Sequence, residues 1–232
     1  MEYLPNGYTM ELPTGTFPLS TDSVVLAHFV RIPKHARVLD LGSGCATLGL
    51  LLCASDPGCH VTGIELSEAS HHAALENIRR NDLTERLYSL CADLRELPRE
   101  FADGSFHCCV SNPPYFSGGP ASSTTPLARR DDCCSPEDLF RAASKALKYG
   151  GDFYLVHKPE KLAQLIICGA ACAMELKQLT LVRHREGSPV SMILLQFKKG
   201  AKPGLQLHEQ CLFDSHGNPT DYYREVYHIK GD

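Results

Sequence analysis

Four residues at the ends of two apolar segments have the types and spacing to bind a nucleoside. Asp40, Gly42 and Gly44 stand at the end of one segment, and Glu65 ends the next. Glycines let a backbone pass close to a ligand at the carboxyl end of a strand, and the later acid can accept both ribose hydroxyl protons. Ala-Thr at 46–47 replaces the third glycine of a dinucleotide fingerprint. The pattern predicts an adenosine-containing cofactor, and a plain tight turn is the alternative.

A second chemical signal is Asn112-Pro113-Pro114-Tyr115, directly after the apolar segment 106–111. The Asn112 side-chain oxygen and the Pro113 carbonyl can accept both hydrogens of an exocyclic amino group and favour a pyramidal nitrogen. Proline rings orient that carbonyl in advance, and the Tyr115 ring offers a face for stacking a flat substrate. The alternative is a rigid turn without chemistry.

These sites need a scaffold, and short apolar segments that alternate with amphipathic ones indicate a parallel sheet covered by helices on both faces. Strands are expected at 37–41, 60–66, 87–91, 106–111, 153–157, 176–185 and 190–198. Helices are expected at 21–30, 46–54, 68–81, 136 to the glycines at 150–151, and 159–174. The last two strands should form an antiparallel pair at one sheet edge, and the tail from Gly200 lacks clear periodicity.

Composition limits the class of protein. The chain has 232 residues, 43% of them hydrophobic, which is enough for one core, and its net charge of −4 excludes binding of nucleic acid by overall charge. A local basic face remains possible. The longest apolar stretches, such as 165–174, are too short to cross a bilayer, and residues 1–15 do not resemble an export signal.

Eleven cysteines, an odd number without a CxxC pair, favour reduced thiols in a cytoplasmic protein. Those that lie in apolar segments should act as small hydrophobes: Cys53, Cys91, Cys108, Cys168 and Cys172. The adjacent pairs 108–109 and 133–134 have no partners at a zinc-site spacing, so we expect no metal.

Segment 40–44, Asp-Leu-Gly-Ser-Gly, resembles the cofactor motif of class I S-adenosylmethionine methyltransferases, in which an acid precedes the glycines. Asp93, after the third strand, matches the acid with which that class contacts the adenine amino group of the cofactor. The tetrapeptide 112–115 resembles the NPPY motif of methyltransferases that modify a planar nitrogen. That motif is shared by enzymes acting on release-factor glutamine, ribosomal guanine and DNA adenine, so by itself it does not select the substrate.

A finer resemblance, to the bacterial tRNA(Val) adenine-N6-methyltransferase family, covers most of the chain. The segments that carry it are 21–27, 112–115, 128–131, 155–162 and 222–224. Asp131 stands where that family is expected to have Glu, and Ala46 where a third glycine is frequent. The first departure affects the substrate side, and the second is sterically small.

The resemblance implies three sets of site residues. Catalytic residues would be Asn112, Pro113 and Tyr115. Cofactor contacts would come from Thr21, Asp22, Asp40, Gly42, Gly44, Glu65, Leu66, Asp93, Leu94 and Asn112. Substrate contacts would come from Pro114, Phe116, Arg129, Arg130, His157 and Lys158. A basic face for phosphates could add Lys161, Arg183, Arg185, Lys198 and Lys199.

The expected fold is a Rossmann-like α/β domain with a mostly parallel seven-stranded sheet, helices on both faces and an antiparallel edge pair near the C-terminus. Residues 1–35 would be an extension that packs on the cofactor site, 36–200 the methyltransferase domain and 201–232 a tail. The expected reaction is N6-methylation of adenine in a tRNA, next to the anticodon. The alternatives are N5-methylation of a protein glutamine and a non-catalytic cofactor-binding subunit. The sequence does not determine the oligomeric state, and we expect a monomer.

Overall fold

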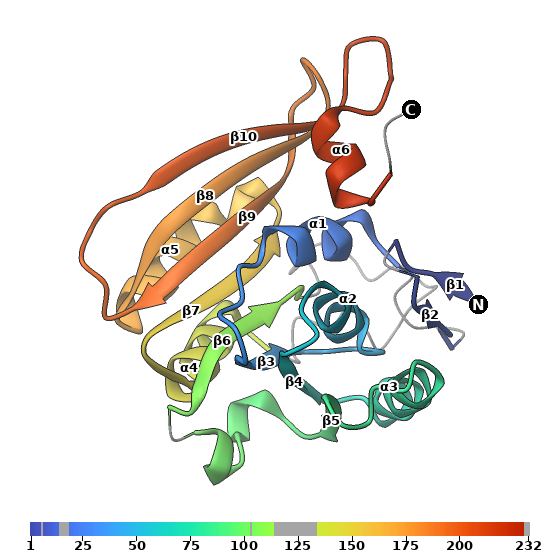
Figure 1. Cartoon of the computed structure of the whole chain (residues 1–232). Coiled ribbons are helices and arrows are strands. Elements are labelled where there is room, and N and C mark those ends of the chain that lie inside the picture. The colour runs from blue at the N-terminus through green and yellow to red at the C-terminus, as the bar shows by residue number, and fades with distance from the viewer. Residues whose placement is uncertain (6, 14–18, 103, 114–133, 230–232) are drawn as a thin grey trace, which may run out of the picture.

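In the computed structural model, the described residues are 1–5, 7–13, 19–102, 104–113 and 134–229. Within them, an eight-stranded sheet in the order β10-β8-β9-β7-β6-β3-β4-β5 forms the centre (Figure 1). Its strands are β3 (Arg37–Leu41), β4 (His60–Glu65), β5 (Leu87–Cys91), β6 (Phe106–Ser111), β7 (Leu147–His157), β8 (Met174–Arg185), β9 (Val190–Lys199) and β10 (Gln206–Phe213). All neighbours pair in parallel except β9, which is antiparallel to both β7 and β8.

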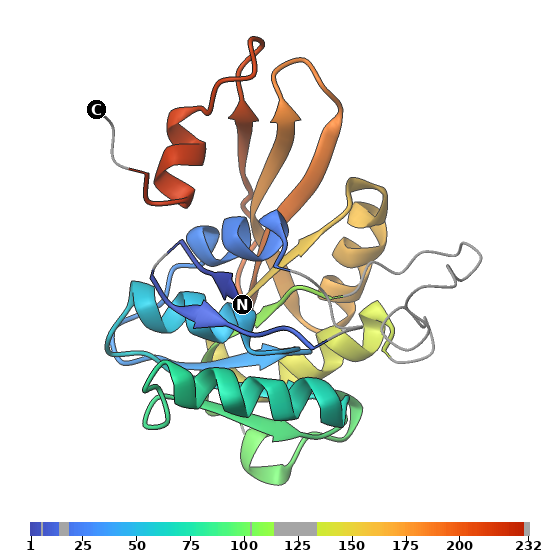
Figure 2. The ribbon, with the colours of Figure 1, turned by 90° about the vertical axis from the view of Figure 1, so that its right-hand side faces the viewer.

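Helices cover both faces of this sheet (Figures 1 and 2). They are α1 (Thr21–Phe29), α2 (Thr47–Ser55), α3 (Glu68–Arg80), α4 (Pro136–Ala146), α5 (Leu162–Ala171) and α6 (Asp221–Val226). Because side chains alternate along a strand, Val38 and Tyr154 join the core under α1, α2 and α3, whereas Leu39 and Phe153 join the core under α4 and α5. Both faces are apolar, which explains the continuous hydrophobic segments of the central strands.

Local signals place several of these elements where the sequence predicts them. The Ser67 hydroxyl accepts a hydrogen bond from the Ser70 amide and starts α3. Ser135 and Asp138 form a reciprocal capping box at the start of α4, with Pro136 at the first helical position. Strands β3, β5 and β6 have the predicted bounds.

The number of strands and some boundaries differ from the sequence-based expectation. The tail contributes an eighth strand, β10, which pairs with β8 on the outside, so the β8–β9 pair does not form the sheet edge. Half of the β10 residues are exposed, and backbone pairing explains the formation of this strand better than any apolar pattern. Helix α4 ends at Ala146 and β7 begins at Leu147, although the glycines at 150–151 suggested a longer helix and a later strand.

Cysteines take varied places in the fold. The ten cysteines that the structure describes all have free thiols. Cys53, Cys108 and Cys168 are buried, as expected, but Cys172 is half-buried and Cys91 is exposed, because β5 is the last strand of the sheet. Across the described ranges there is no cluster of three or more His, Cys, Asp or Glu side chains with metal-site geometry, and no helix is long and apolar enough to span a membrane.

Two asparagines, Asn77 within α3 and Asn81 directly after it, bind the N-terminal hairpin of β1 (Glu2–Tyr3) and β2 (Thr9–Met10). Asn81 accepts from the Thr9 amide at 3.0 Å and donates to the Thr9 carbonyl at 2.7 Å. Asn77 is fully buried; it accepts from the Glu11 amide at 2.7 Å and donates to the carbonyls of Glu11 and Cys45, each at 3.1 Å. One carboxamide therefore links the N-terminal segment, α3 and the turn after β3.

Asn77→Ala should lower the free energy of unfolding by about 2–3 kcal/mol, because the fully buried carboxamide loses its three hydrogen bonds to the backbone of Glu11 and Cys45. Urea unfolding followed by circular dichroism measures this change. The matched control is Glu76→Ala, which removes an exposed neighbour that pairs with Arg79 and should change stability by less than about 0.5 kcal/mol. Equal stability of both variants would contradict this role for Asn77.

Candidate active site

The turn between β3 and α2 has a backbone conformation that suits glycine. Gly42 and Gly44 have φ angles of 76° and 55°, and the amides of Gly42 and Ser43 both donate to the Ile64 carbonyl at 3.0 Å. Ala46 also adopts a left-handed conformation, with φ of 71°. Alanine in place of the third glycine therefore adds backbone strain as well as a small side chain at this position.

Glu65 joins this turn to the end of β4. Its Oε2 accepts from the Gly44 amide and its Oε1 from the Ser67 amide, both at 2.8 Å. The carboxylate therefore stabilises the turn through these two hydrogen bonds without any ligand, a role that the sequence analysis did not predict. Since each carboxylate oxygen has a second lone pair, Glu65 can still accept hydrogen bonds from ligand hydroxyls.

Asp40 lies beneath the same turn and is only 1% exposed. Neither of its carboxyl oxygens has a hydrogen-bond partner within the described residues, and the same is true of the Ser43 hydroxyl. Burial, and to a lesser degree the negative charge of Glu65, raises the pKa of Asp40 to about 8. A buried carboxyl without a partner is costly, and a cationic ligand group would remove that cost. The donor and acceptor set therefore fits a ligand with an ammonium group and ribose hydroxyls.

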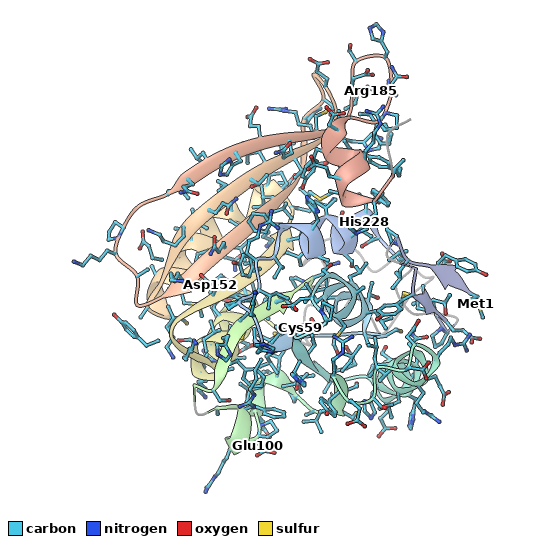
Figure 3. The ribbon with its side chains drawn as sticks, viewed as in Figure 1. Met1, Cys59, Glu100, Asp152, Arg185 and His228 are labelled. Atoms are coloured by element: carbon cyan, nitrogen blue, oxygen red, sulfur yellow. The ribbon has the colours of Figure 1, made fainter. Side chains whose placement is uncertain are left out.

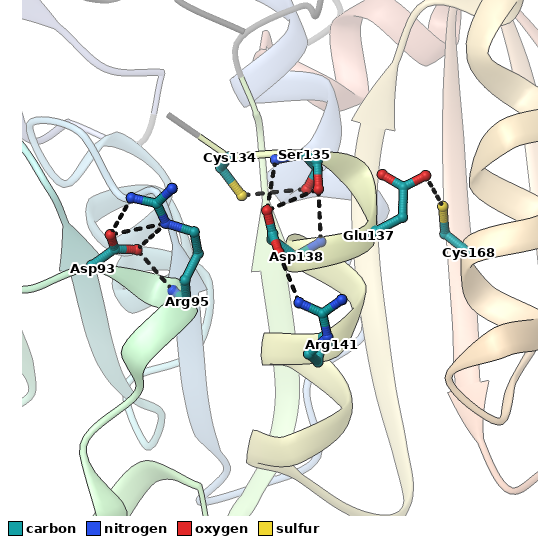
Figure 4. A network of polar contacts seen from close by, with 8 residues as sticks. All are labelled: Asp93, Arg95, Cys134, Ser135, Glu137, Asp138, Arg141 and Cys168. Atoms are coloured by element: carbon teal, nitrogen blue, oxygen red, sulfur yellow. Dashed lines mark hydrogen bonds and ion pairs between the residues drawn. The ribbon is translucent and has the colours of Figure 1, made fainter. Parts of the chain in front are cut away.

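Asp93 follows β5 and is engaged by Arg95 (Figure 4). The Arg95 guanidinium donates to both carboxylate oxygens, with Nε 3.0 Å from Oδ1 and Nη2 2.5 Å from Oδ2, and this contact lowers the pKa of Asp93. A ligand amino group must share the carboxylate with Arg95. The adjoining Leu66, after β4, is 49% exposed, and Leu94 is partly exposed, so both can offer apolar surface to a planar ring.

Asn112 lies directly after β6 and reaches α1. Its Nδ2 donates to the Ser23 hydroxyl at 2.9 Å, which leaves its Oδ1 as the acceptor for another group. Pro113 is buried beside it. Pro114, Tyr115, Phe116, Arg129 and Arg130 lie outside the described residues. Sequence reasoning missed Ser23, although the segment 21–27 that carries the resemblance contains it.

The start of α1 adds Thr21 and Asp22 to the same region. The Tyr227 hydroxyl lies 3.4 Å from the Thr21 hydroxyl, so the end of α6 contacts this helix. Burial raises the pKa of Asp22, and the positive charge of Lys158 partly opposes that effect. The structure therefore brings the beginning of α1 close to the end of β7.

His157 ends β7 and is 1% exposed. Burial lowers its pKa to about 4, so the imidazole is neutral at physiological pH. Its Nδ1 accepts from the Lys158 amide at 2.8 Å, which places the ring proton on Nε2. Pairing of Ser111 with Leu155 sets His157 level with Pro113 across the β6–β7 pair.

The expected basic face forms only in part. Arg183 and Arg185 end β8 at the same end of the sheet as Lys158, and Lys161 follows in the next turn. Lys198 and Lys199 lie at the opposite end, because β9 runs antiparallel. There Lys198 pairs with Asp152 at 3.1 Å, far from Arg185 (Figure 3), and Lys199 donates to the carbonyls of Ser144 and Leu147. Including these two lysines in the basic face was wrong.

Comparison with known proteins identifies the family. Residues 19–178 match the family model described as methyltransferase small domain. The chain belongs to this family. It is therefore a methyltransferase of the S-adenosylmethionine-dependent class, as the resemblance of segment 40–44 indicated, and S-adenosylmethionine is its cofactor.

The names of similar proteins agree with this class. A tRNA1(Val) (adenine(37)-N6)-methyltransferase of Photobacterium profundum is 26% identical over 85% of this chain and 84% of its own length. Its counterpart from Bacteroides fragilis is 28% identical over 77% and 76% of the two chains. A crystal structure from Agrobacterium tumefaciens, described as a predicted O-methyltransferase, has a TM-score of 0.76 at 22% identity and covers 90% of this chain and 96% of that one. It confirms the Rossmann-like fold.

The stability of the cofactor-free methyltransferase should fall between pH 4 and pH 8. In that window folded Asp40 keeps a proton that the unfolded chain, with an ordinary aspartate pKa of 3.8, has lost. The free energy of unfolding should decrease by at most about 1.4 kcal/mol per pH unit from this group. Asp40→Asn should remove that decrease, as measured by urea unfolding at pH 5 and pH 8. Parallel pH profiles of parent and variant would contradict the assignment.

Proposed function

We propose that this methyltransferase modifies the N6 nitrogen of adenine in RNA, specifically the adenine beside the anticodon of a tRNA. The observation that carries the proposal is the orientation of Asn112, whose Nδ2 is bound to Ser23 and whose Oδ1 remains for a substrate amino group. The names of the relatives support the choice of tRNA adenine among the substrates of NPPY enzymes.

On this proposal the cofactor is held at the turn after β3. The Asp40 carboxyl would receive its ammonium group, and Glu65 its ribose hydroxyls, while Gly42 and Gly44 keep the backbone clear of the ligand. Further cofactor contacts are proposed for Thr21, Asp22, Leu66, Asp93, Leu94 and Asn112. S-adenosylmethionine supplies an electrophilic methyl group on its sulfonium.

The substrate amine would be activated by oriented acceptors. Asn112 Oδ1 and the Pro113 carbonyl would accept its two hydrogens, which draws the nitrogen lone pair out of conjugation with the ring. No general base is required before transfer, because the amine proton becomes acidic only after the nitrogen is methylated. Pro114, Tyr115 and Phe116 are proposed to hold the flat base by stacking.

Binding of tRNA by a chain with a net charge of −4 requires a local basic surface. Lys158, Arg183 and Arg185 are proposed to supply it at the end of the sheet where Asn112 lies, with Arg183 also 3.9 Å from Glu209. Arg129 and Arg130 are proposed to add to it, with His157 beside the base as a neutral side chain.

One assay tests the proposed function. The protein is incubated with labelled cofactor and total tRNA from cells that lack this modification, or with a release-factor protein, and the products are digested. Labelled N6-methyladenosine from tRNA is the expected product. Label in release-factor glutamine would show that the substrate is a protein glutamine and not tRNA adenine. No label in either acceptor would favour a non-catalytic subunit.

Asn112→Ala should lower the single-turnover rate of methyl transfer by roughly 10²–10³, because one oriented acceptor is lost from the transition state. Cofactor affinity, measured by calorimetry, should stay within about threefold of the parent. Gln206→Ala, which removes an exposed carboxamide from β10, is the matched control and should react at the parent rate. Full activity of Asn112→Ala would refute the acceptor mechanism.

Cofactor binding at pH 7 should release up to one proton from Asp40. The free carboxyl, with its pKa raised to about 8, is mostly protonated, and an adjacent ammonium group favours its ionised form. Titration calorimetry in two buffers with different ionisation enthalpies measures the number of protons released. Asp40→Asn should release fewer, and equal proton counts for the two proteins would place the ammonium group elsewhere.

A further inference from the structure

One side-chain hydrogen bond joins the N-terminal helix α1 to the residue that follows β6. Ser23 lies in the first turn of α1 and is 6% exposed, and its hydroxyl accepts from Asn112 Nδ2 at 2.9 Å. The two residues are 89 positions apart in the sequence. We propose that Ser23 is a positioning residue that orients the Asn112 carboxamide so that Oδ1 faces the substrate nitrogen. This inference rests on the proposed function of Asn112.

A carboxamide needs such a partner because its two ends have opposite hydrogen-bonding character. Rotation by half a turn about the Cβ–Cγ bond exchanges an acceptor for a donor, and this torsion has a broad, shallow energy profile. A substrate amino group is itself a donor, so an inverted Asn112 would present N–H groups to N–H groups. In the observed orientation the Ser23 oxygen accepts from Nδ2, and this hydrogen bond favours the arrangement in which Oδ1 is the end left for the substrate.

Ser23 is itself held in place by its helix. Its amide donates to the Ser20 hydroxyl at 3.4 Å, which caps the N-terminus of α1, and the two hydroxyls lie 3.4 Å apart. The following residues Val24, Val25 and Leu26 are buried in the core that α1 shares with the sheet. The position of the Ser23 oxygen is therefore set by helix packing, and the bond to Asn112 transmits it to the site.

It follows that α1 completes the active site, although it precedes the first strand of the sheet. Thr21 in the same turn contacts Tyr227, so the C-terminal segment also supports the helix that carries Ser23. A residue that acts in this way should affect the rate of methyl transfer more than the binding of cofactor or RNA.

The experiment compares Ser23→Ala, Ser23→Thr and Ser20→Ala with the parent in single-turnover methylation of tRNA. Ser23→Ala should be about 10–100-fold slower, with cofactor and tRNA affinities within about threefold of the parent. Ser23→Thr keeps the hydroxyl and should recover most of the rate. Ser20→Ala weakens the cap of α1 but leaves the Ser23 hydroxyl, so it should react within about threefold of the parent. An equal loss in Ser20→Ala would show a purely structural effect and overturn the proposal.

A double-mutant cycle tests whether Ser23 acts through Asn112. Adding Ser23→Ala to Asn112→Ala should cause no further loss of rate, because the group that Ser23 orients is already absent. If the fold-losses in rate of the two single variants multiply in the double variant, Ser23 acts independently of Asn112 and the proposal is overturned.

Hydrogen exchange of the Asn112 carboxamide, followed by NMR, provides a readout that does not depend on turnover. The Asn112→Asp variant lacks this carboxamide, so the NMR signal that is missing from its spectrum belongs to Asn112. The carboxamide N–H groups of Asn112 should exchange faster in Ser23→Ala than in the parent and in Ser23→Thr. Unchanged exchange would overturn the positioning role whatever the substrate is. If the parent forms no N6-methyladenosine, the proposed function fails separately, and the exchange measurement still decides the role of Ser23.

Discussion

The site depends on one topological constraint: the chain leaves two neighbouring parallel strands toward opposite faces of the sheet. After β3 it continues into α2 on one face, and after β6 it continues to α4 on the other. Helices α2 and α4 therefore diverge from the carboxyl ends of β3 and β6, the position at which open α/β sheets bind their ligands in a crevice. The turn with Asp40 and Gly42 borders this position from one strand, and Asn112 borders it from the other. On the proposed function, cofactor and methyl acceptor would be brought together because these two strands are hydrogen-bonded neighbours.

The polar groups at this end of the sheet are arranged at some cost to the stability of the free protein. Asp40 is buried without a partner, and Glu65, whose charge disfavours ionisation of Asp40, is held in place by two backbone amides. A fold selected for stability alone would not bury such a carboxyl, and the proposed contact with a cofactor ammonium group would account for its presence under the glycine turn. By contrast, Asn112 has a protein partner for its donor end, which is what an acceptor with a fixed direction requires.

Segments far apart in the sequence complete the site. Helix α1 supplies Ser23, and α6 contacts α1 through Tyr227 and Tyr222, the latter stacked edge-on with His28 at 5.8 Å. Asn77 binds the N-terminal segment to the carbonyl of Cys45 in the glycine turn. The expected division into an extension, a domain and a tail therefore describes sequence order, whereas in the structure the three regions contact one another through these residues. The cofactor turn and the acceptor residue are each supported by the N-terminal region.

Local sequence determined much of this protein. The strand that contains Asp40, the cap at Ser67, the capping box at Ser135 and the strand before Asn112 follow from hydrophobic period, glycine and proline, and short-range hydrogen bonds. These signals act within a few residues, so a single sequence reveals them, and the chemistry of Asp40, Glu65 and Asn112 follows from their places at strand ends. Only the tertiary structure decided which side chains meet. It separated Lys198 and Lys199 from the basic face, because strand direction depends on sheet order. It also added β10 by backbone pairing and placed Ser23 against Asn112, contacts that depend on three-dimensional packing and leave no periodic trace in the sequence.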